Sequence, residues 1–123
     1  MSNLISAALV VAGVIHLLPV TGALGAERLA ALYDVDVGEP NLLILMRHRA
    51  VLFGIVGGVL VAAAFVPAWQ GLALVVGWVS VLAFLALALT TAGYNARIKR
   101  VVVADVVALV CLLVASVGVA LEA

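Results

Sequence analysis

The stretch VVVADVVALVCLLVASVGVAL, from Val101 to Leu121, decides the fold because it is long, apolar and interrupted by one acidic residue, Asp105. A helix needs roughly 20 apolar residues to cross a hydrocarbon core of about 30 Å. Three more stretches share this character, at about residues 4–24, 40–66 and 71–92. Backbone groups in lipid must bond within their own segment, so each stretch is predicted to be helical. The sequence therefore predicts an all-α integral membrane four-helix bundle with both termini on the same side.

The composition is also that of a membrane protein. Of the 123 residues, 68% are hydrophobic and 10% are charged, whereas soluble domains average about 45–50% apolar and about 25% charged residues. The length suits a single transmembrane domain over residues 1–123. A net charge of zero offers no basic surplus for nucleic-acid binding. Cys111 is the only cysteine, which excludes a mechanism that uses two thiols of one chain.

The connections between the predicted spans differ in charge. The first, at residues 25–39, contains a segment at residues 26–33 with its apolar side chains on one side, which predicts a short surface helix. Pro40 suits the first turn of the next helix, and Glu39 suits its positive end. The second connection, at residues 66–71, is uncharged, and the third, at residues 93–100, is short and basic.

All basic residues fall at one predicted membrane face. They are Arg28, Arg47, Arg49, Arg97, Lys99 and Arg100. Because basic residues are in excess on the cytoplasmic side of membrane proteins, the first and third connections are predicted to be cytoplasmic. The sequence thus predicts a multi-pass protein of the bacterial inner (plasma) membrane with its N- and C-termini outside the cytoplasm.

Ionisable side chains inside membrane spans are costly, and they mark functional sites. Asp105 lies about 7–8 Å deeper along its helix than Arg100. His16 and Asp105 are each backed by small residues, which predicts that both face the bundle interior. A polar layer is therefore predicted in the cytoplasmic half of the bundle. Its candidate catalytic residues are His16 and Asp105, and its candidate ligand-binding residues are Arg47, His48, Tyr94 and Asn95.

Helical periodicity predicts which arginine of the second span faces inward. Successive positions turn by 100°, so Arg47 and Arg49 point in different directions. Arg47 shares a face with Gly54 and Gly58, a small-xxx-small pair typical of close helix contacts. Arg47 is therefore predicted to face the bundle, whereas Arg49 is predicted to face lipid and to snorkel to the headgroups.

A structural role stays open for each candidate. The run from Arg47 to Arg49 can form an interfacial belt that binds lipid headgroups. Asp105 can belong to a structural ion pair, and His16 can bond to a neighbouring carbonyl or threonine. Tyr94 can be an interfacial anchor.

Other motifs are missing from the sequence. Two histidines and one buried aspartate make a weak metal site, so neither a metal nor another cofactor is predicted. No serine is expected beside a histidine as a nucleophile, because Ser80 and Ser116 are predicted to lie far from the polar layer.

Three segments carry a resemblance to a family. They are GAERLAALYDV at residues 25–35, LMRHRAVLFG at residues 45–54 and YNARIKRVVVAD at residues 94–105. With these segments the chain resembles, over nearly its whole length, a group of small, uncharacterised bacterial inner-membrane proteins. Some of those proteins carry a phosphopantetheine adenylyltransferase label, but this chain has no candidate parallel strands for such an enzyme. More loosely, its topology is similar to that of DoxX-type four-helix membrane proteins. The resemblance implies a fold and no particular reaction.

Three functions fit the predicted polar layer. The first is an accessory or binding protein that holds a lipophilic ligand, such as a quinone, an isoprenoid or a lipid headgroup. The second is a membrane enzyme of the isomerase or cyclase type, in which His16 or Asp105 exchanges a proton. The third, a transporter or proton path, requires an oligomer. Helices rich in Gly and Ala favour a homo-oligomer, and membrane lipids are the other expected partners.

Cysteine labelling tests the predicted orientation. In a Cys111→Ala background, we expect Gln70→Cys to react with a membrane-impermeant maleimide added to intact spheroplasts, because the uncharged connection lies outside. Lys99→Cys is the control and should react only after the membrane is opened. Labelling of position 70 from the cytoplasmic side alone would refute the topology.

Overall fold

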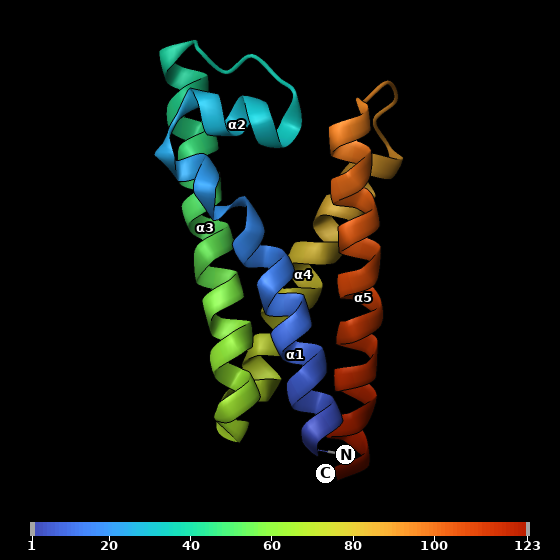
Figure 1. The fold of residues 1–123 in the computed structure, drawn as a ribbon. Helices are drawn as coiled ribbons and strands as arrows, with labels where there is room; N and C mark the ends of the chain where they lie inside the picture. The colour runs from blue at the N-terminus through green and yellow to red at the C-terminus, as the bar shows by residue number, and fades with distance from the viewer. Residues whose placement is uncertain (1, 123) are drawn as a thin grey trace.

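The computed structural model describes residues 2–122 and shows a helical chain without strands in that range (Figure 1). Four segments are long and apolar enough to cross a membrane: Ser2–Leu24, Pro40–Phe65, Pro67–Leu89 and Ala96–Glu122. These segments confirm the predicted all-α bundle of a multi-pass membrane protein. The chain ends near Ser2 and Glu122 lie at the same end of the bundle.

The first span changes its winding near its end. The α-helix α1 covers Ser2–Leu17, and the 3-10 helix η1 covers Leu18–Leu24. Pro19 lies in the first turn of η1. A proline ring removes one backbone donor and clashes with the preceding α-helical turn, which explains why the α-helix stops there.

A helix forms at the predicted residues, as α2 at Ala26–Tyr33. Gly25 joins η1 to α2 with a φ of 144°, a backbone conformation that other residues rarely adopt. Leu29 and Tyr33 of α2 are buried together with Val37 in a small apolar cluster. The cluster holds α2 across one end of the bundle (Figure 1).

The next helix, α3, covers Pro40–Phe65 and begins at the predicted proline. The Glu39 carboxylate accepts hydrogen bonds from the backbone N–H groups of Asn41 (3.0 Å) and Leu42 (2.9 Å). These hydrogen bonds hold the pKa of Glu39 below its usual range. The side chain thus satisfies two of the free N–H groups that every helix start exposes.

The last two long helices are joined differently from the prediction. A 3-10 turn, η2 (Pro67–Trp69), leads into α4 (Gln70–Leu89), and α5 covers Ala96–Glu122. Because the side chain of Asn95 accepts a hydrogen bond from the Ile98 N–H group at 2.9 Å, α5 begins five residues before the predicted start at residue 101. The basic residues of the third connection therefore lie on the first turns of α5.

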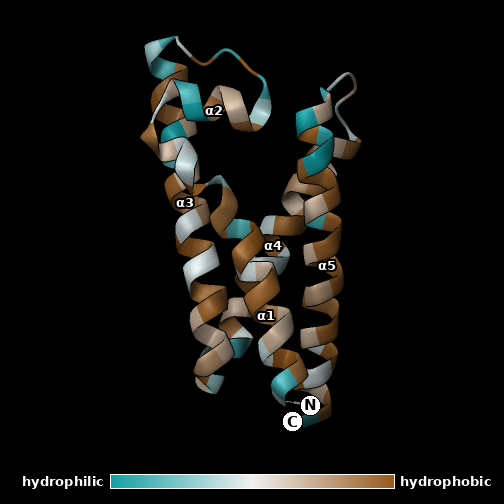
Figure 2. Cartoon of the chain, in the orientation of Figure 1, coloured by the Kyte–Doolittle hydropathy of each residue, from teal (hydrophilic) through white to brown (hydrophobic). Residues whose placement is uncertain are grey.

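Polar residues are concentrated at the end of the bundle that carries α2 and the start of α5 (Figure 2). The opposite end contains the uncharged turn Pro67–Trp69. The predicted gathering of the basic residues at one end is thereby confirmed.

Helices α1 and α3 approach most closely at a pair of glycines. A Cβ atom on Gly57 would lie 2.8 Å from the backbone oxygen of Gly13. A Cβ atom on Gly58 would meet nothing within 4 Å. The close backbone contact of α3 is therefore made by Gly57. Of the predicted pair, Gly54 packs against the first span, because its Cβ atom would lie 3.3 Å from the Val20 side chain, and only Gly58 makes no such contact in the described chain.

We expect Gly57→Ala to destabilise the bundle, because the added methyl group must displace backbone on α1. Overpacking of this kind costs about 1–3 kcal/mol. Gly58→Ala is the matched control and should leave stability unchanged. Thermal unfolding of both variants in the same detergent makes the comparison; an unchanged melting temperature for Gly57→Ala would contradict this packing.

Candidate functional site

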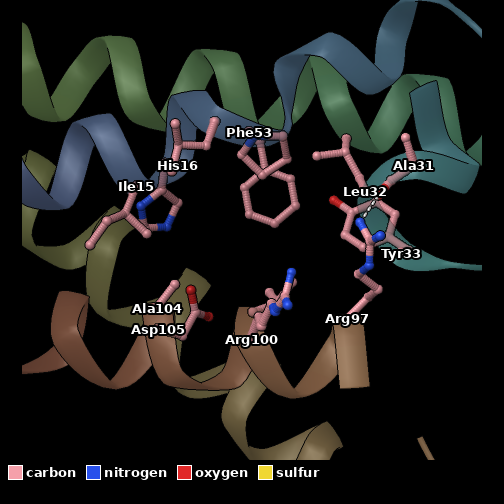
Figure 3. A pocket seen from close by; sticks show the side chains of 13 residues that line it. Ile15, His16, Ala31, Leu32, Tyr33, Phe53, Arg97, Arg100, Ala104 and Asp105 are labelled. Carbon is pink, nitrogen blue, oxygen red and sulfur yellow. Dashed lines mark hydrogen bonds between the residues drawn. The ribbon is translucent and has the colours of Figure 1, made fainter. Parts of the chain in front are cut away.

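A cavity of about 280 Å³ lies at the polar end of the bundle, between α1, η1, α2, α3 and α5 (Figure 3). Much of its wall is apolar, with Ile15, Leu32 and Phe53 among the lining residues. The polar side chains that line it belong to His16, Tyr33, Arg97, Arg100 and Asp105. Ligand pockets measure about 300–1,000 Å³, so this cavity suits the polar part of a larger molecule.

Both ring nitrogens of His16 have protein partners. The side chain is 1% exposed, with Nδ1 2.8 Å from the Ala12 carbonyl oxygen and Nε2 3.0 Å from the Ser80 hydroxyl oxygen. A carbonyl oxygen only accepts hydrogen bonds, so Nδ1 carries the proton of the neutral ring. Nε2 then accepts the hydrogen bond of the Ser80 hydroxyl group.

This arrangement corrects the prediction that Ser80 lies far from the polar layer. Ser80 belongs to α4 and is half-buried, and its hydroxyl group ties α4 to α1 through His16. The sequence hid this contact because it depends on how two separate spans pack at one height. His16 itself faces the bundle interior, as predicted.

Asp105 is buried, faces the cavity and lacks a hydrogen-bond partner within residues 2–122. It is 5% exposed and lies on the cavity wall, where Figure 3 shows its carboxylate pointing into the open space. Every fully buried polar side-chain atom of the described chain has a partner, so the unpaired Asp105 oxygens must be reached through the cavity. The predicted interior position is confirmed.

The predicted facing of the two arginines on α3 is wrong. Arg49 is half-buried, and its guanidinium group lies 4.4 Å from the centre of the Phe53 ring. Arg49 also donates a hydrogen bond of 2.9 Å to the hydroxyl group of Tyr33. Arg47 is exposed and donates to the Ala23 carbonyl oxygen at 2.8 Å. The reason is α2, which covers the side of α3 that periodicity alone assigned to lipid.

The other candidate ligand-binding residues do not line the cavity. His48 and Arg47 are exposed and share a shallow depression on α3. Tyr94 is exposed in the connection between α4 and α5. The side-chain amide of Asn95 donates hydrogen bonds to the carbonyl oxygens of Tyr33 (2.8 Å) and Asp34 (3.1 Å). Asn95 therefore ties the end of α2 to the start of α5.

Arg97 and Arg100 were not among the predicted site residues. Arg97 donates a hydrogen bond to the carbonyl oxygen of Ala31 in α2, and both arginines line the cavity. With Val101 and Ala104 they follow the spacing i, i+3, i+4, i+7 of one helix face. That spacing, continued to Asp105, was the available signal, and it was hidden by the assumption that residues 93–100 form a loop.

The charged groups of the site are one carboxylate and several guanidinium groups. The guanidinium group of Arg49 lies over the ring of Phe53, which is part of the cavity wall. Arg97 and Arg100 add two more positive charges on the cavity wall. Within residues 2–122 no group of three or more His, Cys, Asp or Glu side chains is placed to hold a metal ion. The described side chains thus offer guanidinium donors and one carboxylate acceptor to a ligand.

No family model, curated protein or solved structure matches the chain. The resemblance to small bacterial inner-membrane proteins and to the DoxX type therefore stays a prediction. Function has to be inferred from the cavity itself.

We expect Asn95→Ala to loosen α2. The change removes the side-chain hydrogen bonds to Tyr33 and Asp34, each worth about 0.5–1.5 kcal/mol. Hydrogen exchange of the backbone amides in residues 26–33 should become roughly tenfold faster or more. Tyr94→Phe, at the exposed neighbour, is the control and should leave that exchange unchanged; equal rates in both variants would show that Asn95 does not hold the helix.

Proposed function

We propose that this chain is an accessory or binding protein that holds the headgroup of an amphiphilic ligand in the cavity beneath α2. The observation that carries the proposal is the contrast between two exposed parts of the cavity wall. Arg97 and Arg100 are exposed on one part, and Leu18, which is 63% exposed, lies on another.

The two exposed parts of the cavity wall face different surroundings. Leu18 belongs to a membrane span, so its exposed side chain faces lipid. The arginines lie at the polar end, where water and headgroups meet. A molecule with a charged head and an apolar tail satisfies both parts at once. The volume of about 280 Å³ fits the head, while the tail stays in the bilayer beside Leu18.

The charges favour a headgroup that contains an anionic group. Guanidinium groups bind phosphate and carboxylate through paired, charge-assisted hydrogen bonds. Three guanidinium groups lie in or near the cavity, those of Arg49, Arg97 and Arg100, against the single carboxylate of Asp105. Among the quinones, isoprenoids and lipid headgroups expected from the sequence, a phosphate-bearing amphiphile uses these donors best.

The proposal extends to location and assembly. The basic residues around the cavity support a cytoplasmic position in a bacterial inner membrane, with the chain termini on the other side. The proposal includes a homo-oligomer, which is supported by the high Gly and Ala content of the spans.

The alternative is an isomerase or cyclase that acts on a lipophilic substrate. It is favoured by the free carboxylate of Asp105, which is the deep group placed to exchange a proton with a bound molecule. His16 is a weaker acid–base candidate, since Ala12 and Ser80 occupy both of its nitrogens. Conversion of a bound lipid by the wild type, abolished by Asp105→Asn, would favour the enzyme over the binding protein.

Arg100→Ala and Lys99→Ala test the binding proposal as a matched pair. Both residues are exposed, but Arg100 lines the cavity and Lys99 does not. Hydrogen bonds to charged groups contribute about 1.5–3 kcal/mol, so Arg100→Ala should weaken binding of phosphate-bearing lipids roughly 10- to 100-fold. Lys99→Ala should bind as the wild type does.

Native mass spectrometry of the purified protein, with a defined mixture of phosphatidylethanolamine, phosphatidylglycerol and cardiolipin, measures this binding. A wild-type protein that carries no lipid in several detergents would refute the proposed function. Equal weakening by both substitutions would show that binding is peripheral and not in the cavity.

A further inference from the structure

Asp105 is a buried hydrogen-bond acceptor that has no donor among the described residues. Asp105 is only 5% exposed, and its carboxylate points into the cavity. Burial of a carboxylate without hydrogen bonds costs free energy. A group that donates hydrogen bonds to the carboxylate offsets this cost, so its binding is favoured. Such a donor comes either from a neighbouring side chain or from a bound molecule.

None of the neighbouring side chains fills this role in the described chain. His16 donates its Nδ1–H group to Ala12, and its Nε2 atom is engaged with Ser80. Arg97 donates to Ala31 on the far side of the cavity. Arg49 is stacked on Phe53 and bonded to Tyr33.

The remaining cation on the cavity wall is Arg100, which lies nearer the polar end. It precedes Asp105 by five residues, which corresponds to about 7–8 Å along the helix axis. The cavity is thus polarised along α5, with positive charge at its exposed end and negative charge at its deep end. A ligand of one sign satisfies only one of these ends.

We infer that the headgroup is zwitterionic, with a phosphate bound by Arg100 and a primary ammonium group bound by Asp105, as in a phosphoethanolamine group. This inference rests on the proposed function and names the ligand class of the same cavity. A primary ammonium group brings three N–H donors and a compact positive charge. The two-carbon link places the ammonium group and the phosphate at opposite ends of one headgroup, in the order in which Asp105 and Arg100 follow each other along α5.

The inference makes Asp105 the specificity-determining residue. A glycerol headgroup offers hydroxyl donors but no positive charge. A choline headgroup keeps the positive charge but has no N–H donor, and its three methyl groups need more room. Both should therefore bind more weakly than ethanolamine, although Arg100 still binds the phosphate that all three share.

Binding of three short-chain lipids to the detergent-solubilised, full-length protein tests the inference. The lipids are dihexanoyl phosphatidylethanolamine, phosphatidylglycerol and phosphatidylcholine, and free phosphoethanolamine is a fourth ligand. We expect the wild type to bind phosphatidylethanolamine at least tenfold more tightly than either of the other lipids. Asp105→Asn should reduce this preference to less than threefold while phosphatidylglycerol binding is retained. Glu122→Gln, at the other end of the bundle, should change nothing.

The fourth ligand separates the two sources of the headgroup. Binding of free phosphoethanolamine supports recognition of the headgroup alone, and its failure beside tight lipid binding supports a lipid as the natural source. Equal affinities of the wild type for the three lipids would overturn the inference, even if Asp105→Asn does not fold. A preference that survives in Asp105→Asn would overturn it as well. In both cases lipid binding persists and the proposed function stands, whereas absence of binding by all three lipids would refute that function.

Discussion

The exclusion of charge from hydrocarbon is the constraint on which this structure depends. It keeps the basic residues at one end of the bundle, where α2 and the start of α5 meet (Figure 2). It also explains why Asp105, deeper on α5, requires an enclosed and polar environment rather than a lipid-facing position. Asp105 therefore requires that this part of the bundle be covered, and helix α2 covers it.

Helix α2 is held in place by side chains from α3 and from the region where α5 begins. Tyr33 of α2 is buried and receives the hydrogen bond and the stacked guanidinium group of Arg49 from α3. From the other side, Asn95 and Arg97 donate to the backbone of α2. The cavity beneath α2 thus joins residues that are far apart in sequence, and a ligand that engages Arg97 also acts on the attachment of α2.

Periodicity and composition predicted what depends on one segment at a time. The four spans, the surface helix at residues 26–33, and the interior positions of His16 and Asp105 are of this kind. The facing of Arg49 was mispredicted because it depends on where α2 lies, and the contact between His16 and Ser80 depends on the packing of α1 against α4. Such information resides in tertiary structure, and no pattern within a single helix contains it.

The contact between His16 and Ser80 also bears on the choice between binding and catalysis. A serine hydroxyl group that donates to a histidine nitrogen resembles the start of a nucleophilic mechanism. Here, however, Ser80 does not line the cavity, and the Nδ1 atom of His16 is bonded to the backbone of its own helix instead of to an acid. The pair is thus better explained as a tie between α1 and α4 in an apolar environment. With His16 engaged in that tie, Asp105, Arg97 and Arg100 are the charged groups of the cavity wall that can contact a bound molecule, and such a set favours the proposed binding role over catalysis.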